Sequence, residues 1–320
     1  MSRILIVDDI HVNRLLLKEI LTKISVDCLE AKDGKEALEI LQNEKVDVVL
    51  MDIEMPVMNG LETLTELMKL KPVPKVIILS NLSHEGGEAA IRAFELGALD
   101  YVVKPVRSFM EFDAEQIREE LINKIKSICR SKTVYFPHIK SDYKPPSIVR
   151  KVKYKSGSDG YPEYIVAIGA STGGPKALQE IVTKLPEDIP AAVLIVQHMP
   201  PGFTKSLANR LDSLSMINVK EAEDGDVLAS GWAYIAPGSH HMLVKSSNDN
   251  RYKILLNKEA PENGHRPSVS VMMKSVAETG HNNIIAAMLT GMGSDGSDGI
   301  LEIKKAGGKT IAQDERTCVV

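Results

Sequence analysis

Residues 165–175 read IVAIGASTGGP, in which an apolar run leads into a serine between glycines and then a proline. The apolar run predicts a buried strand, and proline suits the first turn of a helix. The segment therefore predicts a strand, a tight turn and a helix, which is the repeating unit of parallel α/β sheets. Ser171 lies at the turn within the pattern G-x-S-x-G, where a serine is presented as a nucleophile. Glycine-rich turns also bind phosphate, so the pattern alone leaves both interpretations open.

The C-terminal part of the chain, residues 161–320, continues this alternation of strands and helices. Such a pattern predicts a doubly wound, mostly parallel, Rossmann-like α/β domain. The expected strands are 164–168, 191–197, 233–236, 243–244, 254–256, 284–289 and 310–312. The expected helices are 175–185, 204–212, 268–279 and 296–306.

Two more polar residues follow strands of this predicted sheet. His198 ends the next strand after that of Ser171, and Asp295 lies in the glycine-rich loop after a later strand. The carboxyl ends of parallel strands meet at one edge, so the three side chains are expected to converge there. They would act as nucleophile, general base and the carboxylate that orients the base. Asp295 is also a candidate N-cap of the helix expected from Gly296.

A dinucleotide-binding enzyme is the rival interpretation of the glycine-rich turn. Gly169, Gly173 and Gly174 do not fit G-x-G-x-x-G, and His198 stands where that fold places an acid. The chain order of serine, histidine and acid also differs from that of the α/β-hydrolases. The pattern therefore favours hydrolytic chemistry on another doubly wound fold.

Residues 1–125 contain a separate alternation of strands and helices. Five βα units with continuous apolar strands predict a parallel sheet with helices on both faces. The expected strands are 4–7, 26–30, 47–51, 75–79 and 100–103. The expected helices are 12–24, 34–42, 60–70, 87–96 and 108–128.

Acidic residues gather at the strand ends of this N-terminal part. Asp8 and Asp9 follow the first expected strand, and Asp52 follows the third. Neighbouring carboxylates repel one another, and Mg²⁺ relieves that repulsion while it binds phosphate oxygens. Ser80 and Lys104 end the last two strands, where they could contact a bound phosphoryl group. Together these residues predict a phosphoacceptor site.

Residues 1–125, with the stretch MDIEMP at 51–56, resemble the receiver domain of two-component response regulators. The resemblance implies a flavodoxin-like sheet and the phosphorylation of Asp52. It also implies a Mg²⁺ site at Asp9, Asp52 and the backbone carbonyl of Glu54, with Asp8 assisting. The other implied roles are phosphoryl contact for Ser80 and Lys104, a switch role for Tyr101, and a cis bond between Lys104 and Pro105.

The bulk composition excludes several classes of function. A net charge of −4 and 4% aromatic residues give no reason to expect nucleic acid or an anionic membrane as partner. The three cysteines are far apart, which favours reduced thiols. No apolar run reaches the roughly 18 residues of a membrane span, and the N-terminus does not resemble a signal peptide. We therefore expect a cytoplasmic protein without membrane insertion.

Residues 126–160 differ from both parts and are expected to form a basic linker. Asp142 is the one acid between Lys124 and Lys155, and the segment SGSDG at 156–160 interrupts any regular pattern. A solvated tether is the plain interpretation of such a segment. A surface that docks an acidic partner remains an alternative.

The part from Tyr164 onward resembles the catalytic domain of the chemotaxis protein-glutamate methylesterases, the CheB family. With the receiver-like part and the basic linker in front, the resemblance extends over the whole chain. The stretches that carry it are IGASTGGP at 168–175, VQHMP at 196–200, IAPG at 235–238, HRPS at 265–268, TGMG at 290–293 with Asp295-Gly296, and AQDE at 312–315.

This resemblance implies that Ser171 is the nucleophile, His198 the base and Asp295 its orienter. It implies an oxyanion contact from the Met292 N–H, with Thr172 beside the site and no cofactor there. The implied reactions are hydrolysis of glutamate γ-methyl esters on chemoreceptors and deamidation of receptor glutamines. A chemotaxis histidine kinase is the implied phosphodonor, methyl-accepting chemoreceptors are the substrates, and a monomer is expected.

Some residues depart from the family pattern. Ser270 stands where the family has Asp and Met273 near a common Phe, and both are expected to alter substrate fit. The chain ends at Val320, where the family continues with a further helix. We expect the unphosphorylated receiver to cover the Ser171 cleft and phosphorylation of Asp52 to uncover it. A receiver-linked adaptor without catalysis, which binds receptors or kinase, is the alternative.

Overall fold

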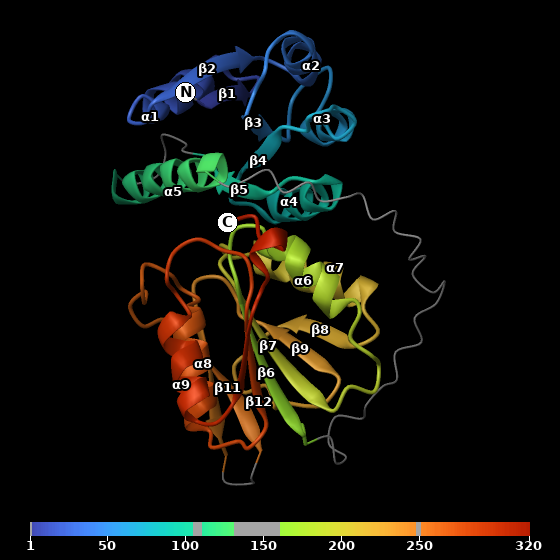
Figure 1. Cartoon of the computed structure of the whole chain (residues 1–320), viewed down its shortest axis with the longest axis vertical. Coiled ribbons are helices and arrows are strands. Elements are labelled where there is room, and N and C mark those ends of the chain that lie inside the picture. Colours follow the sequence, from blue (N-terminus) through green and yellow to red (C-terminus); the bar gives the residue numbers. More distant parts are fainter. Residues whose placement is uncertain (1, 105–110, 131–160, 248–250) are drawn as a thin grey trace. The chain divides into compact units, whose positions relative to one another are not determined.

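A computed structural model describes residues 2–104, 111–130, 161–247 and 251–320. The chain divides into two compact units, one within Met1–Thr133 and the other within Val134–Cys318, and Figure 1 labels most of their elements. Most of the expected linker, from residue 131 on, lies outside the described residues, as do Pro105 and its expected cis bond. None of the described helices is long and apolar enough to cross a bilayer.

The N-terminal unit contains a five-stranded parallel sheet in the order β2-β1-β3-β4-β5. This order confirms the prediction of a flavodoxin-like sheet. Its central strands are continuous apolar runs that are buried on both faces, which is the pattern of an all-parallel sheet. The strands are β1 Ser2–Val7, β2 Val26–Ala31, β3 Val48–Asp52, β4 Lys75–Ser80 and β5 Asp100–Val103.

Five helices pack on this sheet, with α2, α3 and α4 on one face and α1 and α5 on the other (Figure 1). Polar side chains define where several of them begin. The side chain of Ser83 accepts a hydrogen bond from Gly86 N, so α4 begins at His84 and not at Gly87 as expected. The helices are α1 His11–Leu21, α2 Gly34–Asn43, α3 Gly60–Leu67, α4 His84–Leu96 and α5 Glu111–Arg130.

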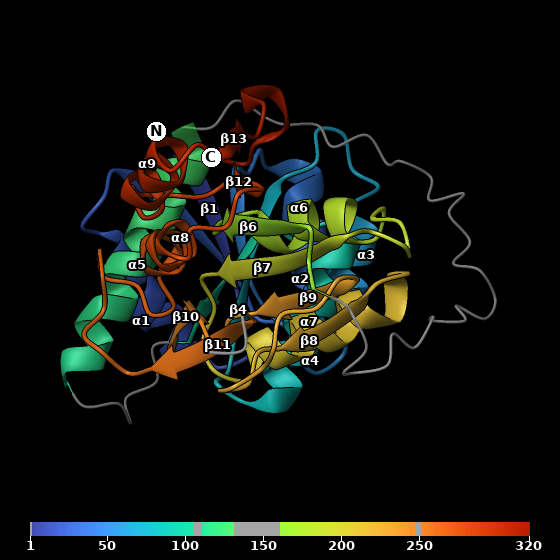
Figure 2. The same cartoon turned by 90° about the horizontal axis from the view of Figure 1, so that it is seen from below.

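The C-terminal unit contains a six-stranded parallel sheet in the order β13-β12-β6-β7-β9-β8, most of which is visible side by side in Figure 2. The prediction of a doubly wound, mostly parallel domain is confirmed. β10 and β11 form a separate antiparallel pair. The strands are β6 Tyr164–Ala170, β7 Ala191–Gln197, β8 Asn218–Glu221, β9 Trp232–Ile235, β10 His241–Ser246, β11 Tyr252–Asn257, β12 Ile284–Met288 and β13 Lys309–Ala312.

The sequence analysis missed β8, because this edge strand reads NVKE and has only one buried residue, Val219. A short run with so few apolar residues carries no strand signal of its own. Pairing with β9 is what makes it a strand.

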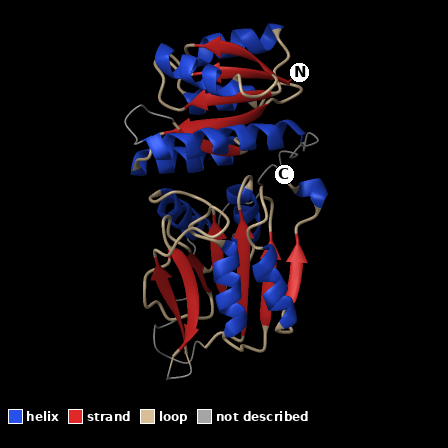
Figure 3. Ribbon diagram, turned by 90° about the vertical axis from the view of Figure 1, so that its left-hand side faces the viewer, coloured by secondary structure: helices blue, strands red, loops and turns tan. Residues whose placement is uncertain are grey.

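Helices α6 and α7 cover one face of this sheet, and α8 and α9 cover the other (Figure 1). Figure 3 shows the strands of both units with helices packed against them. β6 and β7 are central and contribute fully buried residues such as Ile165, Leu194 and Val196. The helices are α6 Gly174–Val182, α7 Phe203–Leu214, α8 Val269–Glu278 and α9 Ser297–Lys305.

One residue of the N-terminal unit has an unfavourable backbone conformation. Val57 has φ of 70°, in a turn closed by the hydrogen bond from Met58 N to Pro56 O (2.8 Å). A β-branched side chain is strained at positive φ, and because Val57 is 81% exposed, burial gains little in return.

We predict that Val57→Asn stabilises the N-terminal unit by about 1 kcal/mol, since Asn tolerates positive φ. Calorimetry of the whole chain measures this, and fluorescence of Trp232, the single tryptophan, identifies the transition of the other unit. Val12→Asn, at a 53% exposed position in α1, is the control and should change little. Equal effects at both positions would contradict the assignment of strain.

Candidate functional sites

The first candidate site lies at the carboxyl ends of the N-terminal strands. Asp8 follows β1, Asp52 ends β3, and Lys104 follows β5, and all three are buried. Lys104 Nζ lies 2.5 Å from Asp52 Oδ2 and 3.3 Å from Asp8 Oδ2. Carboxylate oxygens of Asp8, Asp9 and Asp52 lie within 4.8 Å of one another. The structure therefore gathers the predicted acids and the lysine in one place.

The charges of this cluster are only partly balanced. Burial raises the pKa of Asp52, and the hydrogen bond from Lys104 offsets this only in part. For Lys104, burial acts to lower the pKa, but the contacts with Asp52 and Asp8 outweigh it and the pKa is raised. Lys104 therefore stays protonated among carboxylates that still repel one another. An acidic cluster of this kind is typical of a Mg²⁺ site.

The remaining predicted receiver residues surround this cluster. A small pocket is lined by residues that include Asp52, Glu54 and Ser80. The Ser80 hydroxyl donates to the carbonyl of Gly86 (3.1 Å) in the first turn of α4, so it faces that helix in this structure. Tyr101 is buried and meets Phe94 edge-on, with ring centroids 6.2 Å apart. The Tyr101 ring therefore lies inside the unit, and the switch role of these residues stays a prediction.

The sequence analysis missed Lys124, which is buried in α5 beneath Tyr101. Its Nζ donates to the Tyr101 carbonyl (2.7 Å), pairs with Asp100 (3.2 Å) and Glu120 (2.7 Å), and lies 4.6 Å from the centre of the Tyr101 ring. A lysine in a charged helix carries no sequence signal of burial. Lys124 is buried because α5 packs on the sheet with the face that carries this residue turned toward β5.

The second candidate site begins at the turn after β6. Ser171 N donates to Thr290 O (3.1 Å), and Ser171 O accepts from Gly174 N (2.7 Å). The turn is tight, because Gly173 has φ of 78° and a Cβ on Gly291 would lie 2.8 Å from Ser171 Cβ. Ser171 is therefore held between the sheet and the loop that follows β12, at the N-terminus of α6.

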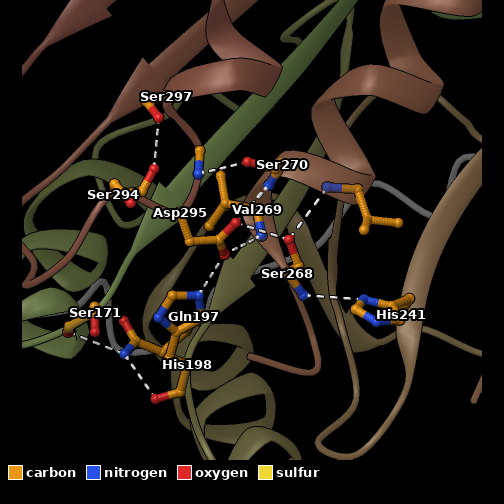
Figure 4. A network of polar contacts seen from close by, with 12 residues as sticks. Ser171, Gln197, His198, His241, Ser268, Val269, Ser270, Ser294, Asp295 and Ser297 are labelled. Atoms are coloured by element: carbon orange, nitrogen blue, oxygen red, sulfur yellow. Dashed lines mark hydrogen bonds and ion pairs between the residues drawn. The ribbon is translucent and has the colours of Figure 1, made fainter. Parts of the chain in front are cut away.

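His198 lies next to this turn, because its N–H donates to Ala170 O (3.2 Å), one residue before Ser171. Its Nε2 donates to Asp295 Oδ2 (2.8 Å), as Figure 4 shows. Its buried Nδ1 has no hydrogen-bond partner among the described residues. With the proton on Nε2, Nδ1 carries the lone pair and is the atom that can accept a proton.

No hydrogen bond between the side chains of Ser171 and His198 is present in the described part of the chain. Such contacts are often long in free enzymes and tighten when substrate binds. The structure places the two residues on neighbouring strand ends, and their catalytic roles stay predictions.

Asp295 accepts hydrogen bonds from four groups. Besides His198, these are Ser268 Oγ (2.7 Å), Val269 N (2.7 Å) and Ser270 N (3.1 Å). Burial alone would raise the pKa of Asp295, but these hydrogen bonds outweigh it and lower the pKa strongly. Asp295 is therefore an ionised acceptor at the site.

Asp295 was also a candidate N-cap of its own helix, and this prediction is wrong. Gly296 is the N-cap of α9 and has no side-chain capping bond. Asp295 instead lies at the N-terminus of α8, whose N-cap is Ser268. The free N–H groups and positive dipole end of α8 stabilise the carboxylate there.

The two remaining predicted site residues lie beside Ser171. Thr172 is buried, and its carbonyl accepts a hydrogen bond from Thr290 Oγ1 (3.0 Å). Met292 belongs to the same loop, directly after Gly291, which packs on Ser171. The oxyanion contact of the Met292 N–H stays a prediction.

Neither of the two departures from the family pattern is exposed to solvent, and their expected effect on substrate fit stays a prediction. Ser270 and Met273 are both fully buried. The Ser270 hydroxyl accepts from Gly296 N (2.8 Å) and so supports the loop that carries Asp295. Met273 packs against Gly299 of α9.

Other residues that the sequence analysis did not assign support this network. Gln197 Nε2 donates to the carbonyls of Ser171 (3.0 Å) and His198 (3.3 Å), which links the two strand ends. His241 Nδ1 accepts from Ser268 N (3.2 Å) (Figure 4). Gln197 belongs to the motif VQHMP at 196–200, and His241 begins strand β10. The sequence does not indicate the hydrogen-bond partners of either residue, which only the tertiary structure shows.

Fold and sites define a class of protein: a receiver unit joined to an α/β unit with the residues of a serine hydrolase. Family models agree, with the receiver domain of response regulators at residues 4–112 and the CheB methylesterase at residues 166–320. A protein-glutamate methylesterase/protein-glutamine glutaminase of Pyrococcus abyssi is 45% identical over 99% of this chain and 85% of its own. One of Halalkalibacterium halodurans is 43% identical, with coverage of 99% and 89%. The chain belongs to the CheB family of protein-glutamate methylesterases.

Among solved structures, the catalytic domain of Thermotoga maritima CheB methylesterase is similar to the C-terminal part. It is 48% identical, with a TM-score of 0.48, and the match covers 50% of this chain and 83% of that one.

We predict that Asp295→Asn destabilises the C-terminal unit by about 2–4 kcal/mol, because an amide nitrogen would face N–H and O–H donors. Denaturant unfolding followed by Trp232 fluorescence measures the loss. Asp298→Asn, an exposed change in the first turn of α9, should cost less than about 0.5 kcal/mol. Similar losses in both variants would contradict the prediction.

The lowered pKa of Asp295 also predicts how the stability of the C-terminal unit depends on pH. The pKa of Asp295 is lowered by folding, so its stabilisation is present above the unfolded value of about 4 and is lost as the pH falls below it. Wild type should lose stability below pH ~4 more steeply than Asp295→Asn.

Proposed function

We propose that this protein is a phosphorylation-regulated methylesterase that hydrolyses glutamate γ-methyl esters on chemotaxis receptors, with Ser171 as nucleophile. The observation that carries the proposal is the His198–Asp295 pair (2.8 Å), which lies on the strand end next to Ser171 and leaves His198 Nδ1 available as a base. The methylesterase activity is that of the family to which the chain belongs.

The residues support a two-step acyl transfer. Ser171 Oγ attacks the ester carbonyl while His198 Nδ1 takes its proton, and the resulting imidazolium gives that proton to the departing methoxide, which leaves as methanol. Water then attacks the acyl-enzyme by the same proton route, which releases the free glutamate and restores Ser171. With a receptor glutamine in place of the ester, the leaving group is ammonia.

Charge stabilisation accompanies each step. Asp295 stabilises the imidazolium through the Nε2–H hydrogen bond. The N-terminus of α6 directs its positive dipole end toward Ser171, and the Met292 N–H is the proposed donor to the oxyanion, with Thr172 alongside. These groups act together on the negative charge that develops on the carbonyl oxygen.

In the receiver unit, the carboxylates fit a hard cation, since they lie together, are partly buried and keep unbalanced repulsion. Asp9, Asp52 and the carbonyl of Glu54 would hold Mg²⁺, with Asp8 assisting. When bound, this ion would offset the charge of the carboxylates and of the phosphoryl oxygens. Asp52 is the proposed phosphoacceptor, and Lys104 is the proposed partner of the phosphoryl group.

A phosphoryl group at Asp52 would compete for the Ser80 hydroxyl, which now donates to Gly86 of α4. A shift of Ser80 and Tyr101 would then alter the face formed by α4, β5 and α5. We assign the phosphodonor role to a chemotaxis histidine kinase and the substrate role to methyl-accepting chemoreceptors. The enzyme would work as a cytoplasmic monomer whose unphosphorylated receiver blocks access to Ser171.

We predict that Ser171→Ala lowers the release of methanol from methylated receptors by roughly 10⁴-fold or more. Ser294→Ala, an exposed serine of the loop that carries Asp295, is the control and should keep activity. A serine-directed organophosphate should label Ser171, as peptide mapping would show. A receptor-binding adaptor would keep its output in Ser171→Ala, and that result would overturn the esterase proposal.

We predict that Asp52→Asn abolishes stimulation of hydrolysis by a small-molecule phosphodonor with Mg²⁺, while basal hydrolysis remains. Asp27→Asn serves as control, since Asp27 belongs to the same sheet but pairs with Arg3 (2.8 Å). The measurement is the rate of ester hydrolysis by wild type and both variants, with and without the phosphodonor. Undiminished stimulation in Asp52→Asn would rule out the assigned phosphoacceptor.

A further inference from the structure

A short hairpin before α8 carries a second histidine toward the site. Asn263 and Gly264 both have positive φ, of 54° and 79°, as expected of a two-residue type I′ turn. Glu262 and His265 flank this turn and exchange two backbone hydrogen bonds, of 3.1 and 3.0 Å. The Asn-Gly pair in the sequence is the strongest short hairpin signal, so the arm of residues 262–265 is built locally.

The arm of residues 262–265 is tied to the domain at both ends. Glu262 Oε1 pairs with Lys274 Nζ of α8 (2.7 Å). Arg266 Nη1 donates to the carbonyls of Lys258 (3.1 Å) and Glu259 (2.9 Å), while its own carbonyl accepts from Ser239 N (3.2 Å). These contacts fix the position of the residue between them, His265.

The ring of His265 lies flat on the ring of His198. The centroids are 3.8 Å apart and the planes differ by 7°. His198 Nε2 is bound to Asp295, and its buried Nδ1 has no hydrogen-bond partner among the described residues. One hydrogen bond fixes the place of Nε2 but leaves the tilt of the ring plane free. The stack removes that freedom and does not occupy Nδ1 with a hydrogen bond.

We propose that His265 is a positioning residue for hydrolysis: its stacked ring holds the plane of His198 so that Nδ1 stays aligned with the Ser171 hydroxyl. The proposal rests on the proposed roles of Ser171 and His198. It requires a flat ring at position 265 and a rigid hairpin beneath it, and it assigns His265 no proton transfer of its own. Alignment of reacting groups contributes strongly to acyl-transfer rates, and small displacements are costly.

The first test compares a flat with a non-flat replacement of similar size. His265→Phe keeps a stacking ring and should retain kcat within about threefold, whereas His265→Leu should lower kcat by about tenfold or more with KM unchanged. Methanol release from methylated receptors by the full chain gives both constants. Wild-type kcat in His265→Leu, or equal losses in both variants, would overturn the proposal.

The second test moves the ring without changing it. Gly264→Ala strains a backbone at φ 79° but meets no atom within 4 Å, and Gly280→Ala does the same at φ 68° away from the arm. Both variants should lower the melting temperature by a similar amount. Only Gly264→Ala should also lower kcat, by about threefold or more. Equal kcat in the two variants would overturn the proposal.

These outcomes are distinct from failure of the proposed function. If Ser171→Ala keeps hydrolysing esters, the proposed function itself fails. If Ser171→Ala is inactive while His265→Leu is fully active, only the role of His265 fails. Melting temperatures of all variants show whether a loss of rate comes from unfolding.

Discussion

The four hydrogen bonds to the Asp295 carboxylate hold the hydrolytic site together. Three of them come from the start of α8 and one from His198, so a single buried charge joins a helix N-terminus, the loop after β12 and the end of β7. A carboxylate buried without these donors would be costly, and with them it is an acceptor for the Nε2–H of His198. The tautomer of His198, and hence the identity of its basic atom, follows from this arrangement.

Both units use the same geometric device for different chemistry. The carboxyl ends of parallel strands bring residues from distant parts of the chain to one edge. In the N-terminal unit that edge collects carboxylates and a lysine, whose incomplete charge balance suits a cation and a phosphoryl group. In the C-terminal unit the edge collects a hydroxyl, an imidazole and one carboxylate that is fully supplied with donors. The two sites therefore differ in the number of carboxylates and in the number of hydrogen-bond donors that each carboxylate has.

Much of the fold could be predicted, because buried parallel strands are continuous apolar runs and helices repeat their apolar residues every third or fourth position. Strands such as β5 and β7 were expected with the bounds the structure gives them. β8 could not be found, since its only strong signal is the neighbouring strand β9. The start of α4 was missed because Ser83 caps it, and that hydrogen bond outweighs two glycines in the first turn.

The sequence by itself predicted where the strands end. It thereby predicted that Ser171 and His198 lie close together, since adjacent parallel strands share an edge. The sequence also placed Asp8, Asp52 and Lys104 at one edge of the other sheet. Only the tertiary structure decided that Asp295 accepts hydrogen bonds from the N-terminus of α8 and does not cap its own helix. It also decided that the ring of His265 stacks on the ring of His198. Those contacts join segments far apart in the chain, and no local pattern encodes the packing of one loop against another.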